Sequence, residues 1–197
     1  HLRPRRQRQM CIRDRFTRGE YIYYYRNDGL QNQYVVYRKK DNLNSSEEVF
    51  LDPNKFSEDG TISLTGLYFS EDGKLISYTI SEGGSDWRKA IVMDTETKQI
   101  IGDTLTNIKF SGISWSGNKG FYYSSYDKPE GSELSEYTDR HKLYYHELNT
   151  DQKSDKTVFG DQSEKYRYVS GNVSDDNNFL FISASNLTDG NELYMIC

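Results

Sequence analysis

The chain contains 197 residues, of which 35% are hydrophobic and 14% aromatic, with 17 tyrosines among them. This length suffices for one domain with a sizeable core, and the many tyrosines favour strands with solvated faces over a helical bundle. The sequence has no run of about 18 apolar residues, so we expect no membrane-spanning helix and no membrane partner. The two cysteines, Cys11 and Cys197, are too few for a disulfide framework.

The formal net charge of −5 is unevenly distributed along the chain. Residues 1–15 hold six Arg and one Asp, whereas the remaining residues carry 19 basic and 29 acidic side chains. Residues 1–15 lack hydrophobic periodicity and the apolar core of a secretory signal, so we interpret them as a foreign or artefactual basic segment. A nucleic-acid-binding arm is the alternative interpretation of this segment. The acidic remainder argues against nucleic acid as a partner.

From Gly19 onward, short segments rich in Tyr, Val and Ile alternate with turn residues, as in a chain of antiparallel strands. Asp28-Gly29 supplies left-handed positions for one turn, and Pro53 restricts the backbone of another. The long polar stretch from Tyr126 to Arg140 is predicted to be a loop, of a length that is often functional. In chain order, the predicted strands cover residues 21–25, 34–38, 49–51, 61–64, 75–80, 87–93, 99–101, 108–110, 121–123, 142–148, 158–159, 166–169, 179–183 and 192–196.

A turn phrase recurs along the chain: an apolar residue, then Ser, then two or three turn-forming residues before a strand. Its serines, Ser70, Ser116 and Ser174, are 46 and 58 residues apart, and about 40–50 residues is the period of a four-stranded propeller blade. The second interval is longer by roughly the length of the 126–140 loop, as expected for an insertion in one blade. We therefore predict an all-β fold, a partial β-propeller of three to four antiparallel blades with unpaired edges and marginal stability.

Several phrases resemble the prolyl oligopeptidase family, serine peptidases that cut peptides after proline. They are GLQNQ at 29–33, VFLDPN at 49–54, FSEDG at 69–73, GSDW at 84–87, IKFS at 108–111 and HKLYYH at 141–146. The similarity runs from about Gly19 to Tyr194 and is closest in character to bacterial members. It implies that residues 16–197 are part of a seven-bladed N-terminal propeller, and that the catalytic α/β-hydrolase domain is absent from this chain.

The resemblance also implies roles for individual residues. The propeller would gate access to the hydrolase domain, so the implied partners are proline-containing oligopeptides and that domain. Phe110 matches an aromatic residue in the wall that binds the third residue of the peptide, and Tyr168 lies near the same region, where the family has an apolar residue. Asp86 matches an interdomain acid that pairs with an Arg of the hydrolase domain, and the 126–140 loop matches a mobile gating loop.

Each of these roles has a structural alternative. Phe110 could be a core residue, Asp86 could satisfy the backbone amides of its own turn, and the 126–140 loop could be a surface insertion. For the whole chain, the alternative is a non-catalytic propeller scaffold that binds other proteins, because the repeat period alone does not determine function.

The sequence lacks the Gly-x-Ser-x-Gly motif of a nucleophile elbow, so we expect this chain alone to be inactive as a peptidase. His141 and His146 belong to a strand pattern; we predict no catalytic role for either and a structural role for His146. Since Cys-x-x-Cys, His-Glu-x-x-His and clustered-histidine motifs are also lacking, we expect neither a metal ion nor a cofactor.

Overall fold

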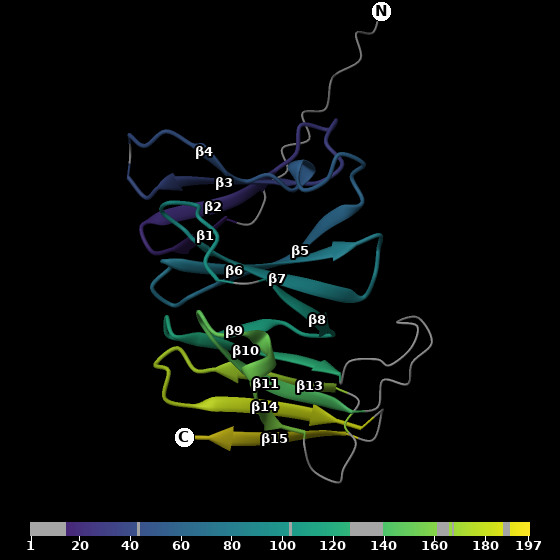
Figure 1. Ribbon diagram of the computed structural model, residues 1–197. Helices are drawn as coiled ribbons and strands as arrows, with labels where there is room; N and C mark the ends of the chain where they lie inside the picture. The colour runs from purple at the N-terminus through teal and green to yellow at the C-terminus, as the bar shows by residue number, and fades with distance from the viewer. Residues whose placement is uncertain are drawn as a thin grey trace, which may run out of the picture.

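The computed structural model describes residues 15–42, 44–102, 104–126, 140–160, 166, 168–186 and 190–197. These residues form four antiparallel sheets, each built from strands that are consecutive in the sequence. Figure 1 shows the sheets following one another in chain order, with the C-terminus at the end of the last one. This arrangement confirms the prediction of an all-β fold built from successive blades.

The first three blades have four strands each, and the fourth has three. Blade 1 contains β1 (Arg15–Arg18), β2 (Tyr21–Arg26), β3 (Val35–Lys40) and β4 (Glu48–Leu51); blade 2 contains β5 (Ile62–Phe69), β6 (Leu75–Glu82), β7 (Trp87–Asp94) and β8 (Leu105–Lys109). Blade 3 contains β9 (Ile113–Ser116), β10 (Gly120–Tyr126), β11 (His141–Glu147) and β12 (Lys156–Phe159); blade 4 contains β13 (Tyr168–Val173), β14 (Leu180–Ser185) and β15 (Asn191–Ile196). Two short 3-10 helices, η1 (Pro53–Lys55) and η2 (Gln152–Ser154), lie in connections.

Several strand boundaries differ from those that the sequence predicts. Strand β5 continues through the predicted break after residue 64, where a bulge between Leu64 and Gly66 shifts the register. The predicted strand 99–101 is reduced to one isolated bridge between Ile100 and Met93. Strand β1 starts at Arg15, the last residue of the segment interpreted as foreign, and residues 1–14 of that segment lie outside the described residues.

The recurrent turn phrase connects the first and second strands of a blade. In blade 2, Ser70 Oγ accepts the Leu75 N–H at 3.0 Å and donates to the Asp72 carboxylate at 3.0 Å. In blade 4, Ser174 Oγ likewise accepts the Phe179 N–H at 3.0 Å and donates to Asp176 at 2.5 Å. In blades 2 and 4, the serine side chain of the phrase therefore supplies a partner to a backbone group that a tight turn leaves unpaired.

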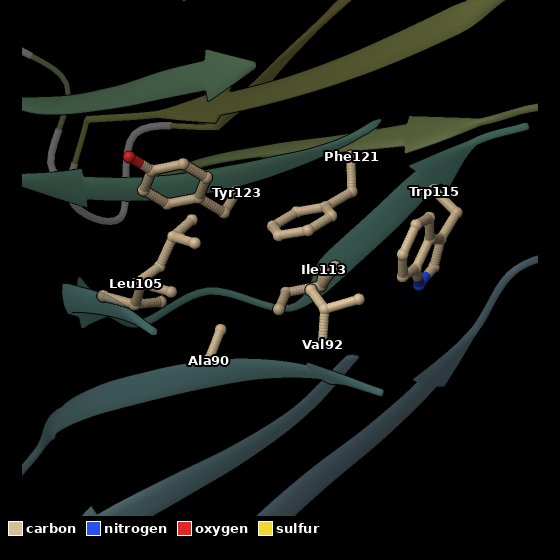
Figure 2. Packing of buried hydrophobic residues seen from close by; sticks show 8 residues of the cluster. Ala90, Val92, Leu105, Ile113, Trp115, Phe121 and Tyr123 are labelled. Atoms are coloured by element: carbon tan, nitrogen blue, oxygen red, sulfur yellow. The ribbon is translucent and has the colours of Figure 1, made fainter. Parts of the chain in front are cut away.

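The hydrophobic core lies between neighbouring blades. Between blades 2 and 3, Trp115, Phe121 and Tyr123 of blade 3 face Ala90 and Leu105 of blade 2 (Figure 2), and each of these side chains is at most 7% exposed. Equivalent clusters join blade 1 to blade 2 and blade 3 to blade 4. Face-to-face packing of sheets thus fixes the position of each blade relative to the next.

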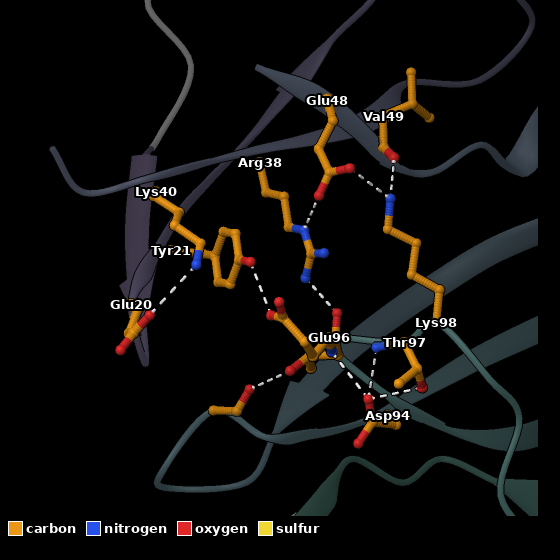
Figure 3. A network of polar contacts seen from close by, with 12 residues as sticks. Glu20, Tyr21, Arg38, Lys40, Glu48, Val49, Asp94, Glu96, Thr97 and Lys98 are labelled. Carbon is orange, nitrogen blue, oxygen red and sulfur yellow. Dashed lines mark hydrogen bonds and ion pairs between the residues drawn. The ribbon is translucent and has the colours of Figure 1, made fainter. Parts of the chain in front are cut away.

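A polar network adds to the contact between blades 1 and 2 (Figure 3). The buried guanidinium of Arg38 in β3 donates to Glu48 in β4 at 2.6 Å and to the Thr95 carbonyl in blade 2. Lys98 of blade 2 donates to Glu48 at 3.1 Å and to the Val49 carbonyl at 2.8 Å. Arg38 therefore links both blades, and its contact with the Thr95 carbonyl is largely removed from water.

Because every blade is an antiparallel meander, two kinds of connection emerge on the same side of the molecule. These are the loops between second and third strands and the links from one blade to the next. We call this side the link side; it carries residues 83–86, 110–112 and 140. The turns that contain Ser70 and Ser174 lie on the opposite side.

Candidate functional site

Three aromatic side chains from blades 2, 3 and 4 meet on the link side, and we call them the aromatic site. Phe110 follows β8, Tyr126 is the last residue of β10, and Tyr168 is the first residue of β13. The Phe110 ring meets the Tyr168 ring edge to face at 5.7 Å and 75°, and the Tyr126 ring at 6.3 Å and 87°. These distances and angles are those that aromatic quadrupoles favour.

The structure brings Phe110 and Tyr168 together although 58 residues separate them in the sequence. Phe110 is 42% exposed and Tyr168 is 39% exposed, whereas Tyr126 beneath them is 6% exposed. Phe110 is therefore not a core residue, and the two outer rings leave aromatic surface available to a ligand.

The backbone that carries Phe110 has an unusual conformation. Phe110 has a φ of 49° and Asn107 a φ of 57°, in the left-handed region that side chains other than glycine seldom adopt. Such strain persists only where surrounding contacts hold it. Blade 3 supplies these contacts: Ser125 donates to the Asn107 carbonyl, and His141 Nε2 bonds the Lys109 carbonyl at 2.9 Å.

His141 is fully buried at the start of β11 and connects three blades. Its Nδ1 accepts the Val169 N–H of blade 4 at 2.8 Å, so Nε2 carries the proton donated to Lys109 of blade 2. Burial lowers the pKa of His141 to about 4, although the hydrogen bond to the Lys109 carbonyl acts in the opposite direction. The ring is therefore neutral at pH 7, and it packs against Tyr126 at 4.5 Å.

Lys109 and Trp87 extend the aromatic site toward Asp86. The Lys109 ammonium lies 4.8 Å from the centroid of the Trp87 ring and 5.3 Å from that of Phe110. Trp87 and Lys109 are paired residues of β7 and β8, which explains their proximity. No binding role for Lys109, Trp87 or His141 follows from the sequence, because strand alternation reveals neither which residues pair across neighbouring strands nor which residues meet between blades.

Asp86 is exposed in the loop between β6 and β7, next to Trp87 in the chain. The turn is closed by Ser85, whose Oγ accepts the Trp87 N–H at 3.1 Å and whose carbonyl accepts from Ser81 Oγ at 2.6 Å. With the residues that the structure describes, the Asp86 carboxylate makes no hydrogen bond or ion pair. The structure thus gives the local turn role to Ser85 and leaves Asp86 available to a partner.

Two further features that the sequence singled out are the 126–140 loop and His146. In the loop 126–140, residues 127–139 lie outside the described residues, and Tyr126 at its start belongs to the aromatic site. His146, at the other end of β11, is 3% exposed; its Nδ1 bonds Asp155 Oδ1 at 2.8 Å, and Tyr123 donates to Asp155 Oδ2 at 2.8 Å. This buried network packs inside blade 3, as a structural role for His146 requires.

No group of three His, Cys, Asp or Glu side chains that could hold a metal ion occurs in the described part of the chain. The described ranges also contain no helix long and apolar enough to cross a membrane.

A hollow of about 780 Å³ runs along the first strands of all four blades. It is lined by Thr17, Phe69, Trp115 and Val173, among others, and opens near the turns opposite the link side. A smaller cavity of about 210 Å³ adjoins Ser111 and Gly112, directly after Phe110. The first strands of the blades therefore surround a common space, and Phe110, Tyr126 and Tyr168 are not among the residues that line it.

Four meander sheets whose first strands line a common hollow define a β-propeller. The chain belongs to the prolyl oligopeptidase family, because residues 6–197 match the model of the prolyl oligopeptidase N-terminal β-propeller domain. The match begins inside the segment interpreted as foreign, and the domain boundary at residue 15 stays a prediction.

Sequence relatives and solved structures agree with this result. The chain is 55% identical over 181 residues to a prolyl endopeptidase of Elizabethkingia miricola, covering 91% of this chain and 25% of that protein. A solved prolyl endopeptidase superposes with a TM-score of 0.79 at 29% identity, covering 92% of this chain and 25% of that one. Prolyl oligopeptidase B of Galerina marginata, bound to a 35-residue substrate, superposes with a TM-score of 0.78 at 27% identity over 89% of this chain and 27% of that one. The chain thus spans about a quarter of these relatives, and the predicted family and propeller fold are confirmed.

Proposed function

We propose that this chain is part of the propeller of a serine-type prolyl endopeptidase, where it gates access to the active site and forms part of the peptide-binding wall. Hydrolysis would require an α/β-hydrolase domain that supplies the nucleophile, the base and the oxyanion donors. The 197 residues contain no nucleophile-elbow motif, so the chain alone would be inactive. The observation that carries the proposal is the partly exposed Phe110–Tyr168 pair on the link side.

In this proposal, Phe110 and Tyr168 bind the third residue on the amino side of the cut. Two rings held edge to face offer an apolar wall at little entropic cost, because both side chains are already ordered by their mutual contact. Lys109, held between Trp87 and Phe110, would order the Phe110 ring further through its cation–π contact. Such a wall favours an aromatic or large aliphatic residue at that peptide position.

Asp86 would form an ion pair with an arginine of the hydrolase domain when the two domains close. Its exposed carboxylate and its position near the aromatic site support this role. An ion pair across a domain interface would couple closure to substrate binding. The loop 126–140 would contribute to the same gate, since it starts at Tyr126.

Peptidase assays on the complete protein that carries this chain, compared with the 197-residue chain alone, test the proposal. We expect only the complete protein to cleave after proline. Phe110→Ala should raise the KM for peptides with an aromatic third residue about 2- to 10-fold, the value of one aromatic contact, whereas Phe110→Tyr should retain most of the affinity. A complete protein that cleaves no proline peptide would overturn the proposal in favour of a non-catalytic propeller scaffold.

Asp86→Asn tests the interdomain role separately. We expect kcat/KM to fall a few-fold at low salt and the difference from wild type to shrink at high salt, because exposed ion pairs are screened. Asp28→Asn is the matched control, since Asp28 is also exposed in the loop between the second and third strands of its blade. Equal effects of the two substitutions would refute a specific role for Asp86.

A further inference from the structure

His141 is the point at which the backbones around the aromatic site are held together. It bonds the carbonyl of Lys109, the residue before Phe110, and accepts the N–H of Val169, the residue after Tyr168. Its own N–H donates to the Tyr166 carbonyl at 2.8 Å. The buried His141 side chain therefore bonds the backbone next to each exposed ring. The imidazole also packs against the Tyr126 ring.

We propose that His141 is a positioning residue that holds Phe110 and Tyr168 in their edge-to-face arrangement and so sets the affinity of the aromatic site for the third residue of a peptide. This inference rests on the function proposed above for the site. His141 itself is buried, so it would act through the two rings without touching the substrate.

The backbone conformation of Phe110 explains why the peptide unit before it needs a hydrogen bond. A left-handed conformation at a bulky residue relaxes unless neighbouring groups oppose the change. The bond from His141 Nε2 holds the peptide unit between Lys109 and Phe110, and rotation of that unit would move the Phe110 ring away from Tyr168. Loss of the bond would also deprive the partly buried Lys109 carbonyl of this donor.

The chemistry of the site requires an imidazole with one donor and one acceptor. A leucine fills a similar volume but leaves both the Lys109 carbonyl and the Val169 N–H without a partner. A protonated imidazole has two donors, so its Nδ1 would face the Val169 N–H unfavourably. Among the described residues, the titratable ones that contact His141 are Lys109 of blade 2, Tyr126 of blade 3, Tyr168 of blade 4 and, through its backbone carbonyl, Tyr166.

The first test compares His141→Leu with His146→Leu in the complete peptidase. Both histidines are buried in β11, at opposite ends of the strand, so both substitutions remove hydrogen bonds from the same element. Two substrates are used. One has an aromatic residue at the third position on the amino side of the cut, and the other begins at the second position and so lacks the third. We expect His141→Leu to raise KM for the longer substrate about 2- to 10-fold while leaving the shorter one within about 2-fold. His146→Leu should leave the KM ratio of the two substrates unchanged.

The second test reads the ring geometry without activity. Nuclear Overhauser contacts between the Phe110 and Tyr168 rings should be present in the wild-type chain and in His146→Leu, and lost in His141→Leu. If His141→Leu does not fold, the wild-type chain is titrated from pH 7 toward pH 4, and the ring contact should weaken as the His141 signals report protonation.

The outcomes separate the two proposals. A complete protein that does not cleave proline peptides would overturn the peptidase function, while the ring contacts would still decide the positioning role. Contacts that persist without His141, or with His141 protonated, would overturn the positioning role. An unchanged KM ratio in His141→Leu would do the same.

Discussion

Arg38→Met is expected to weaken the junction between blades 1 and 2 and to destabilise the chain. The guanidinium of Arg38 is buried, donates to the Thr95 carbonyl of blade 2 and lies 4.1 Å from the centroid of the Tyr21 ring (Figure 3). Methionine retains the unbranched apolar stem of the side chain but removes the guanidinium with its charge and all its hydrogen-bond donors. The substitution therefore preserves the packing of the stem and removes the contacts of the guanidinium.

The expected loss can be worked out contact by contact. A hydrogen bond from a charged group to a buried carbonyl contributes about 1.5–3 kcal/mol, and the contact with the Tyr21 ring contributes about 0.5–2 kcal/mol. The ion pair with Glu48 adds at most about 1 kcal/mol, because 47% of the Glu48 side chain is exposed to water. Together these contacts predict a loss of about 2–6 kcal/mol, a large part of the stability of an ordinary domain.

Urea denaturation of the purified chain measures this loss. Arg38→Met should lower the midpoint with little change in the slope, since the native surface stays similar. Glu48→Gln serves as the control and should cost less than about 1 kcal/mol, because its partner Arg38 keeps the Thr95 carbonyl. A cost below about 1 kcal/mol for Arg38→Met, or an equal cost for Glu48→Gln, would refute the reasoning.

Two further predictions concern stability. Because the pKa of His141 falls from 6.5 to about 4 on folding, the unfolded state binds more protons between these values, so the free energy of unfolding should drop by about 3 kcal/mol as pH falls from 7 to 4. Carboxyl groups whose pKa is lowered by folding, such as those of Glu48 and Asp72, destabilise both chains toward pH 4. Denaturation curves should therefore show a drop that is larger in wild type than in His141→Leu by about this amount, and parallel curves would contradict it. Gly120→Ala would place a methyl carbon 2.2 Å from the His146 carbonyl oxygen, whereas the control Gly112→Ala meets no atom closer than 3.5 Å. Only Gly120→Ala should therefore lower the melting temperature, by several degrees. Equal melting temperatures of the two variants would refute the close approach.

Local signals in the sequence were sufficient for most strands and for the blade repeat. Alternating aromatic and aliphatic residues predicted β2, β6, β7 and β11 within a few residues of their observed bounds, because side chains alternate between the faces of any strand. The turn phrase around Ser70 and Ser174 was recognisable because its hydrogen bonds join residues at most five apart. Four-residue strands were the hardest to recognise, since they are too short to establish alternation: β1 and β9 were missed, and β4 and β12 were predicted only in part.

The arrangement of the candidate site depends on contacts between blades. The sequence by itself determined the fold class and, through the family phrases, singled out Phe110, Tyr168 and Asp86. Only the tertiary structure decided that Phe110 and Tyr168 are neighbours, that Ser85 rather than Asp86 closes its turn, and that His141 holds the site together. The bonds of His141 span 32 and 28 residues, and such pairings follow from the packing of whole blades against one another rather than from any local pattern of side chains.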